Sequence, residues 1–175
     1  MPDALRADIS LLFNFFVTGQ RIRRLLADAM APSGMSPDEY AVYSLLFEMA
    51  PLTATQMSDF LGMPLSTVLD YLKAMGRARH LERVPHPSDG RAVQLRLSAS
   101  GRASFQRGSA RFNVANKRFL ELLNLPADRV RSALGAMDDA AQAMSARGEV
   151  APGGHAPARA RRAQRSASRR PPRSG

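Results

Sequence analysis

The sequence predicts a mainly α-helical protein with a small β-hairpin wing, a winged helix-turn-helix with long helices at both ends. Three observations predict this fold class. Two short helices with capping residues follow each other between residues 53 and 79. Two short strands then flank a tip rich in Pro, Ser and Gly. Apolar residues at helical spacing precede and follow this unit, at about 4–30 and 100–147.

The composition is that of an ordinary globular protein. The chain has 175 residues, of which 45% are hydrophobic and 23% charged. It has no cysteine, which excludes disulfides and thiolate metal sites, and its three histidines are widely separated. We therefore expect no metal and no cofactor. Neither a signal peptide nor an apolar run of membrane-spanning length is evident, so we expect a cytoplasmic protein without a membrane span.

The first half of the chain contains clear helix boundaries. A first helix is expected over about 4–30 and ends at Pro32-Ser33-Gly34. Ser36 and Glu39 form a capping box for a second helix, which Pro51 stops. Its expected buried stripe consists of Tyr40, Tyr43, Leu46 and Phe47.

The two short helices have the same kind of signals. Thr53 and Gln56 form a second capping box, and Gly62 suits the left-handed position that ends this helix. Met57, Phe60 and Leu61 are expected to face inward. The next helix, at about 65–79, divides into an apolar face and a polar face. The apolar face has Leu65, Val68, Leu72 and Met75, and the polar face has Ser66, Asp70, Lys73 and Arg77, with Thr67 and Tyr71 beside it.

The second half continues with the hairpin and two long helices. Strands are expected at 81–84 and 93–97, and Ser98 or Ser100 caps a helix that reaches about Leu123. Phe105, Phe112 and Phe119 recur every seven residues, and a last helix follows Pro126. The long terminal helices can bury their stripes across a two-fold axis or within one subunit, and we favour a dimer. Residues 149–175, rich in Arg, Ala and Pro, are expected to be disordered.

Positive charge is concentrated in two parts of the chain. The net charge is +10, and residues 151–175 contain seven arginines and no acid. Residues 73–118 contain eleven basic residues and two acids, between flanking segments that are acidic on balance. A positive block that begins in the second short helix and spans the hairpin is typical of a phosphate-binding face. The alternative is a solvated surface.

Short motifs in this block resemble a known family. Ser66-Thr67-Val68 begins the second short helix, Leu81-Glu82-Arg83 leads into the hairpin, and Asp89-Gly90-Arg91 forms its tip. Leu95-Arg96-Leu97-Ser98 follows, and then Gly101. With these residues the chain resembles, over about 5–147, the winged-helix repressors of the multiple-antibiotic-resistance regulator (MarR) family.

The resemblance implies a homodimer that binds a palindromic operator in double-stranded DNA. Each subunit contributes one recognition helix and one wing, and a small, often aromatic effector binds between the dimer helices and the DNA-binding lobes. The winged-helix domain is then expected at 1–148, with the DNA-binding lobe at about 36–98. Dimerisation helices are expected at about 4–30 and 100–147, with the disordered tail at 149–175.

The wing tip contains the strongest single candidate. The guanidinium of Arg91 can enter the narrow, electronegative minor groove, and by analogy with the family Asp89 orients it. The alternative is an ordinary Asp-Gly turn with a surface arginine. The arginine-rich tail can neutralise phosphates without reading sequence, or it can serve only solubility.

Further DNA-binding candidates lie on the second short helix. Ser66 and Thr67 can bond phosphates or base edges, although Ser66 can equally cap the helix. Tyr71 can reach the DNA backbone or bury its ring. Lys73 and Arg77 are phosphate-binding candidates or a solvated face.

Two residues depart from the family pattern. Asp70 stands where a basic or neutral residue is common; it can accept from cytosine N4 or pair with a neighbouring cation such as Arg77. Arg79 stands where the family has glycine, so we expect the helix to end without a left-handed residue there.

Taken together, these features predict a sequence-specific, ligand-responsive transcriptional repressor that is associated with the nucleoid. A non-specific basic chromosome-binding protein is the alternative that the tail suggests, and a winged helix used for protein contacts is a third. We expect no enzyme, because a catalytic triad and a glycine-rich phosphate loop are not apparent.

Overall fold

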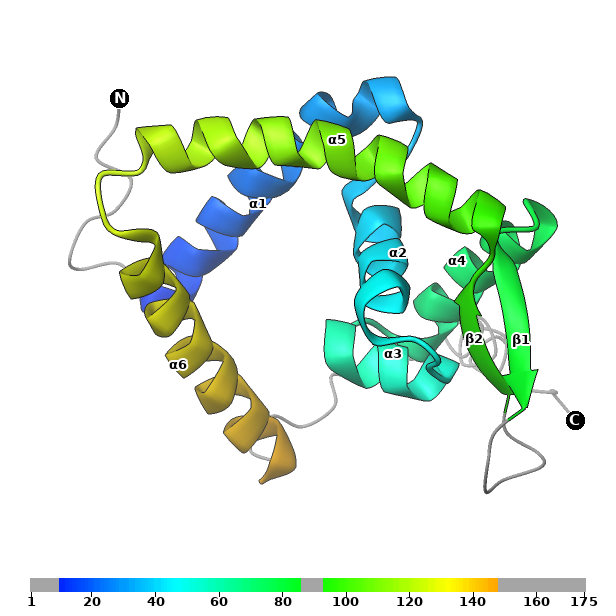
Figure 1. Ribbon diagram of the computed structural model, residues 1–175. Helices are drawn as coiled ribbons and strands as arrows, with labels where there is room; N and C mark the ends of the chain where they lie inside the picture. The colour runs from blue at the N-terminus through cyan, green and yellow to red at the C-terminus, as the bar shows by residue number, and fades with distance from the viewer. Residues whose placement is uncertain (1–9, 86–92, 148–175) are drawn as a thin grey trace, which may run out of the picture. The chain divides into compact units, whose positions relative to one another are not determined.

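A computed structural model describes residues 10–85 and 93–147 and confirms the predicted fold class. The described residues form helices and one antiparallel hairpin, β1–β2 (Figure 1). The elements are α1 (Leu11–Met30), the short 3₁₀ helix η1 (Ala31–Ser33), α2 (Pro37–Met49), α3 (Ala54–Leu61), α4 (Leu65–Arg77), β1 (Leu81–Pro85), β2 (Val93–Leu97), α5 (Ala99–Leu122) and α6 (Ala127–Ala146). The start of the expected first helix, the wing tip and the arginine-rich tail lie outside the described residues.

The chain divides into two units, residues 1–122 and 123–175, and the first contains the whole winged helix. In this unit α5 is the long connecting element. Its first half packs on α2 and β2, and its second half packs on α1 (Figure 1). Within the second unit α6 spans Ala127–Ala146, and none of its described residues is buried.

The predicted helix caps are confirmed in geometry. The Ser36 hydroxyl accepts from the Glu39 backbone N–H at 3.1 Å, and the Glu39 carboxylate accepts from the Ser36 N–H at 3.2 Å. Thr53 and Gln56 form the same reciprocal pair, at 3.2 and 2.9 Å. Each box satisfies N–H groups that a helix start otherwise leaves unpaired. Gly62 adopts the expected left-handed conformation, with φ of 61°.

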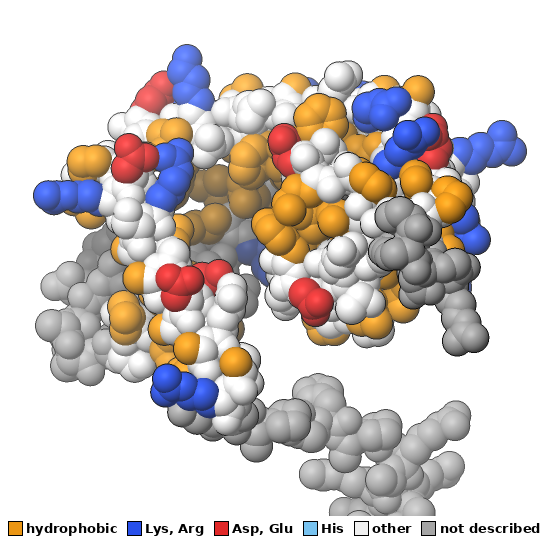
Figure 2. All heavy atoms as spheres, turned by 60° about the horizontal axis from the view of Figure 1, so that its bottom comes forward, with side chains coloured by type: hydrophobic (Ala, Val, Ile, Leu, Met, Phe, Trp, Pro, Cys, Tyr) orange, Lys and Arg blue, Asp and Glu red, His pale blue; other side chains and the backbone are white. Residues whose placement is uncertain are grey.

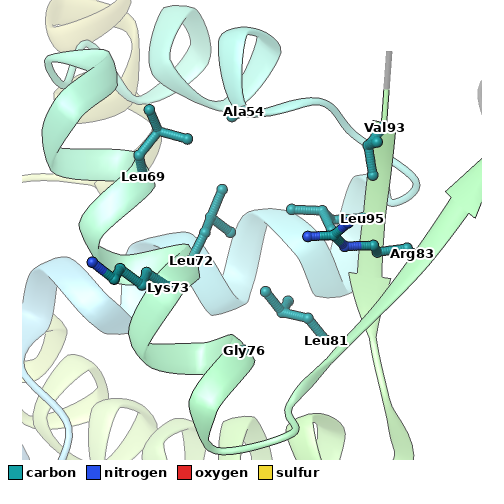
Figure 3. Close-up of a pocket in the computed structure, with 9 residues that line it drawn as sticks. All are labelled: Ala54, Leu69, Leu72, Lys73, Gly76, Leu81, Arg83, Val93 and Leu95. Carbon is teal, nitrogen blue, oxygen red and sulfur yellow. The ribbon is translucent and has the colours of Figure 1, made fainter. Parts of the chain in front are cut away.

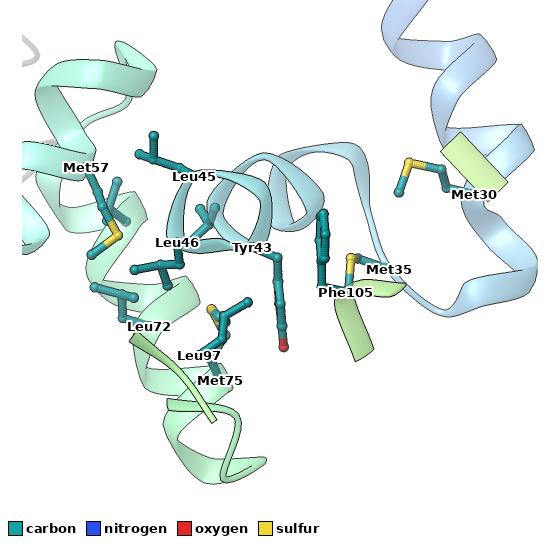
Figure 4. Close-up of a cluster of buried hydrophobic side chains, with 12 residues drawn as sticks. Met30, Met35, Tyr43, Leu45, Leu46, Met57, Leu72, Met75, Leu97 and Phe105 are labelled. Atoms are coloured by element: carbon teal, nitrogen blue, oxygen red, sulfur yellow. The ribbon is translucent and has the colours of Figure 1, made fainter. Parts of the chain in front are cut away.

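One hydrophobic core lies between α2, α3, α4, the hairpin and the first half of α5 (Figure 4). Its members are Met30, Met35, Val42, Tyr43, Leu45, Leu46, Met57, Val68, Leu72, Met75, Leu97 and Phe105. Because α2 packs against α3 and α4 on one side and α5 on another, it buries more than a single stripe. Val42 and Leu45 are therefore in the core although the predicted stripe omitted them.

Three residues expected to face inward are exposed. Phe60 is 65% exposed. The inward side of α3 lies midway between Met57 and Leu61, and Phe60, three residues after Met57, is rotated away from that side. Phe47 is 44% exposed, although its ring stacks on Phe105 at a centroid distance of 4.4 Å. Leu65 is 41% exposed because it lies in the first turn of α4, at the margin of the core.

The expectation for Arg79 is wrong: this residue does adopt the left-handed conformation, with φ of 58°. Its backbone N–H donates to the carbonyl of Gly76 at 3.0 Å, and the His80 N–H donates to that of Met75 at 2.9 Å. This pair of bonds is the Schellman motif, which satisfies the last carbonyls of α4 at a position that usually holds glycine. The reverse turn needed to enter β1 is thus made at the cost of a strained arginine.

The end of α4 is fastened to the start of α5. The hydroxyls of Ser98 and Ser100 donate to the Arg79 carbonyl at 2.8 and 2.9 Å, and the Ser98 N–H donates to the His80 carbonyl at 3.0 Å. Ser98 also accepts from the Gly101 N–H at 3.1 Å, which makes it the cap that the sequence suggested. Gly101 is buried directly against His80: a Cβ on Gly101 would overlap the His80 carbonyl oxygen and lie 3.0 Å from its carbonyl carbon.

The Gly101→Ala variant is expected to lose stability, because its methyl group cannot be placed without separating α4 from α5. The expected decrease in the free energy of unfolding is about 2–3 kcal/mol or more, measured by urea denaturation. Gly76→Ala is the matched control, because Gly76 lies in the last turn of α4 and open space surrounds the position of an added Cβ. This control should gain about 0.5–1 kcal/mol. Equal stabilities for Gly101→Ala and the parent would contradict the close approach.

The Arg79→Gly variant is expected to be more stable by about 0.5–1 kcal/mol, because glycine adopts the left-handed conformation without steric strain. Thermal and urea unfolding measure the change. Ala78→Gly is the control: Ala78 is right-handed, with φ of −76°, and glycine there should lower stability by about 0.5–1 kcal/mol. A loss of stability in Arg79→Gly would show that the arginine side chain offsets its own backbone strain.

Candidate nucleic-acid interface

The outer surface of α4 is the polar face that the sequence predicts. Val68, Leu72 and Met75 are buried and fix the orientation of the helix. As a result, the opposite side presents Ser66, Asp70, Lys73 and Arg77 to solvent, and all four are exposed. A helix held by one face, with polar and cationic groups on the other, is suited to lie in a DNA groove.

The first turn of α4 is open at its backbone. Its N-cap is Pro64, and no side chain caps the helix. The alternative role of Ser66 as the helix cap is therefore wrong, because Ser66 lies inside the first turn rather than before it. The N–H groups of this turn, together with the Ser66 and Thr67 side chains, form a donor-rich end that favours an anion such as phosphate.

Tyr71 lies beside the exposed face and not within it. Its ring is half-buried and packs against the hydrophobic core. Burial raises the pKa of the Tyr71 phenol, and the negative charge of Asp38 raises it further, while a hydrogen bond with the Ser36 side chain opposes them. The ring thus connects α4 to the start of α2, as the burial alternative expects. A contact of Tyr71 with DNA stays a prediction.

Asp70 is the one acid on the exposed face of α4. The expected alternative, a pair with Lys73 or Arg77, is not formed: the ion pairs among the described residues are Arg23–Asp38, Arg96–Glu82, Arg118–Glu121 and Arg131–Asp128. The carboxylate of Asp70 thus stays available as a hydrogen-bond acceptor on the outer side of the helix.

The hairpin beside α4 is anchored at its base. Leu81 pairs with Leu97 and Pro85 with Val93, and an ion pair joins Glu82 and Arg96 across the strands at 2.8 Å. Leu52, in the loop before α3, exchanges backbone hydrogen bonds of 3.1 and 2.8 Å with Leu95 of β2. The base of the wing is therefore fixed relative to α3 and α4. Asp89 and Arg91, the candidates at the tip, lie outside the described residues.

A cleft of about 750 Å³ separates α4 from the hairpin (Figure 3). Its wall is apolar: Leu69 and Leu72 come from α4, and Leu81, Val93 and Leu95 come from the strands. Two cations border it, Lys73 on α4 and Arg83 on β1, and the Arg83 guanidinium points into the cleft in Figure 3.

Sequence reasoning missed the apolar part of this surface. Leu69 is 48% exposed and Val93 is 45% exposed, although the pattern gave Leu69 no role. Figure 2 shows hydrophobic side chains exposed on one face of the protein, with both acidic and basic side chains among them. The sequence contained one indication of this surface: Leu69 is apolar although it falls outside the predicted buried stripe of α4.

A second, smaller cavity of about 170 Å³ lies where α2, the end of α4 and α5 meet. It is lined in part by Glu39, Tyr43, His80 and Ser104. The Tyr43 hydroxyl is 2.6 Å from His80 Nδ1, and the Tyr43 ring meets that of His80 edge-on. Burial raises the pKa of the Tyr43 phenol, and Glu39 adds to this, against opposing contributions from Ser104 and Arg107.

Residues 10–85 and 93–147 include neither a membrane-spanning helix nor a metal-binding cluster. No helix there combines the length and the apolar character needed to cross a bilayer. Within the same residues no group of three or more histidine, aspartate or glutamate side chains is placed to hold a metal ion.

Comparisons with known proteins agree on the fold, although no family model matches the chain. A curated relative, the HTH-type transcriptional repressor Rv2887 of Mycobacterium tuberculosis, is 24% identical over 125 residues, which cover 71% of this chain and 90% of the relative. A probable transcriptional regulator from Pseudomonas aeruginosa aligns with a TM-score of 0.65 and 26% identity, over 75% of this chain and 99% of that one. A mutant of Escherichia coli MarR complexed with operator DNA aligns with a TM-score of 0.62 and 21% identity, over 74% and 92%.

The chain has the MarR fold. The resemblance drawn from the motifs between Ser66 and Gly101 is thereby confirmed for the architecture, including the order of the helices around the winged unit. In this fold α4 is the second of the two short helices, and β1–β2 is the hairpin that follows it.

The raised pKa of Tyr43 predicts a loss of stability at alkaline pH. Above about pH 10, the ordinary value for tyrosine, the unfolded chain releases this proton while the folded chain retains it, so ionisation favours unfolding. Between about pH 9 and pH 11, the unfolding free energy of Tyr43→Phe should therefore fall less than that of the parent. Urea denaturation at each pH measures it, and parallel curves for parent and variant would contradict the assignment.

Proposed function

We propose that this protein is a sequence-specific DNA-binding transcriptional repressor that acts as a homodimer on a palindromic operator. The observation that carries the proposal is the exposed polar and cationic face of α4, held beside an anchored hairpin in the MarR fold. One structure with this fold is complexed with operator DNA, and the curated relative is named a repressor.

Each candidate residue has a distinct role in this proposal. Lys73 and Arg77 bind phosphates as point charges, and the open first turn of α4, with Ser66 and Thr67, donates hydrogen bonds to the same backbone. Such contacts position the protein without specifying a sequence. Asp70 is repelled by the phosphates of the DNA backbone, and it faces the base edges, where it accepts a hydrogen bond from the N4 amino group of cytosine. Beyond the described hairpin strands, Arg91 enters the minor groove, and Asp89 orients it.

The apolar surface of α1 supports the homodimer. Leu11, Leu12, Phe13, Phe15 and Phe16 are each at least 50% exposed in the single chain. A soluble protein rarely leaves such a contiguous run of large apolar residues in water. A second copy that packs against α1 would cover it, and a two-fold dimer would present two α4 helices to successive major grooves, about 34 Å apart.

Ligand response is the finer part of the proposal. The cavity beside Tyr43 and His80 adjoins both the end of α4 and α5, so a molecule bound there can bias the position of the DNA-binding lobe relative to α5. At about 170 Å³ it is smaller than the roughly 300–1,000 Å³ of drug-sized sites, which favours a small effector.

The alternative of a non-specific chromosome-binding protein is not favoured. That alternative came from the arginine-rich tail alone, whereas the exposed face of α4 has an acid, Asp70, next to its cations, and an acid is unfavourable for binding DNA without regard to sequence. The three similar proteins described above are named as transcriptional regulators or repressors.

Selection of bound fragments from the source genome tests the proposal as a whole. Sequencing of the retained fragments should give one palindromic motif, and footprinting should protect that palindrome at concentrations where neighbouring DNA stays unprotected. Uniform coating of every fragment at moderate ionic strength, or a monomeric protein in solution, would contradict it.

Removal of a phosphate-binding cation should change the salt dependence of binding in a calculable way. Arg77→Gln is expected to reduce the slope of log affinity against log salt by about 0.9 for each subunit, because one counterion fewer is released per phosphate. Fluorescence anisotropy with the selected operator over a series of salt concentrations measures this slope. Arg131→Gln, which removes an exposed cation paired with Asp128 on α6, is the control and should leave the slope unchanged.

A further inference from the structure

Two leucines on α4 are exposed next to its polar face, and neither belongs to the core. Leu65 is 41% exposed and Leu69 is 48% exposed, and their spacing of four residues places them one turn apart on the same side of the helix. Figure 3 shows Leu69 directed into the open cleft between α4 and the hairpin. The side chain lies on the same helical turn as the exposed Asp70.

The chemistry of the first two turns of α4 is unusual for a DNA-reading helix. Residues 65–72 include no Arg, Lys, Asn or Gln, the side chains that read guanine and adenine in the major groove. Their exposed members are instead Leu65, Ser66, Leu69 and Asp70. An apolar side chain matches the C5-methyl group of thymine, and a carboxylate accepts from the N4 amino group of cytosine. Both partners are pyrimidines.

The position of these residues agrees with direct reading. In helix-turn-helix proteins the N-terminal residues of the recognition helix contact base edges. The cations of the helix, Lys73 and Arg77, come later, and Arg83 borders the other side of the cleft. An apolar patch between cations suits a partner that offers methyl groups within a polyanion, and duplex DNA has this chemistry. A neutral protein surface does not.

We infer that the first two turns of α4 read pyrimidines, with Leu69, supported by Leu65, in contact with thymine C5-methyl groups and Asp70 accepting from cytosine N4. This inference rests on the proposed function, because it specifies what the same DNA interface recognises. It adds Leu69 and Leu65 to the residues that determine specificity.

The decisive experiment removes single methyl groups from the DNA. Each thymine of the selected operator is replaced in turn, in both half-sites, by deoxyuridine, which differs only in lacking the C5-methyl group. Loss of one buried methyl group should weaken binding of the unmodified protein by about fourfold for each half-site at one or two positions. Thymines elsewhere in the operator serve as the internal control.

The leucine is then paired with the methyl group in a double-mutant cycle. Leu69→Ala should weaken binding to the thymine operator and should show no further loss on the sensitive deoxyuridine operator. Leu69→Met is the conservative variant, and it should retain most of the methyl sensitivity. Met49→Ala removes an apolar side chain that is 47% exposed at the end of α2, and it should leave both affinities unchanged. For Asp70, Asp70→Asn should lower the preference for cytosine at one position and raise it for adenine.

The outcomes separate the inference from the proposed function. If the protein selects a palindrome but no deoxyuridine substitution weakens binding, the inference is overturned while the proposed function stands. If Leu69→Ala loses the same factor on both operators, the leucine packs on the DNA backbone or on the wing, and methyl reading is again overturned. If no fragment is selected, the proposed function fails together with the inference.

Discussion

The junction between α4 and α5 is the constraint on which the rest of the structure depends. The chain leaves α4 through a left-handed Arg79, and the carbonyls of Arg79 and His80 are bound by Ser98 and Ser100 at the other end of the hairpin. Gly101 then allows the backbone of α5 to lie directly against His80. Because both ends of the hairpin are joined at this point, the wing emerges in a fixed direction relative to α4.

The same junction connects the exposed face of α4 to the rest of the first unit. From Ser98, α5 continues without a break to Leu122, packing first on α2 through Phe105 and then on α1. Tyr43 connects α2 to the same junction, because its hydroxyl is hydrogen-bonded to His80 Nδ1 beside the small cavity. A displacement of α5 relative to α2 would therefore also displace the end of α4. The two helices are joined there by the hydrogen bonds of Ser98 and Ser100 and by the close backbone contact of Gly101.

Local signals explain what the sequence predicts well. The boxes at Ser36 and Thr53, and the cap at Ser98, depend on residues within three positions of each other, so the sequence alone identifies them. Burial depends on which elements pack together, and the pattern therefore missed Val42 and Leu45 on the doubly packed α2 and misplaced Phe60. Arg79 was mispredicted for a related reason: the cost of left-handed backbone is local, but the bonds that offset it come from Ser98 and Ser100, about twenty residues later. For the site, the exposed face of α4 was predictable from periodicity, whereas the role of Leu69 emerges only from its exposure beside the cleft.

The exposed leucines of α4 and the exposed Asp70 are best understood as one arrangement. Each feature alone is unfavourable. An exposed leucine contributes no hydrophobic stabilisation to the fold, and a carboxylate on this face repels the phosphates of DNA. On a helix end that enters the major groove, the same features become discriminating, because a methyl group and an amino group are what the pyrimidine edges offer there. Under the proposed function, Lys73, Arg77 and Arg83 attract any duplex, whereas Leu69 and Asp70 determine which sequence is bound. Affinity and specificity are then provided by different residues, the first by the cations and the second by Leu69 and Asp70.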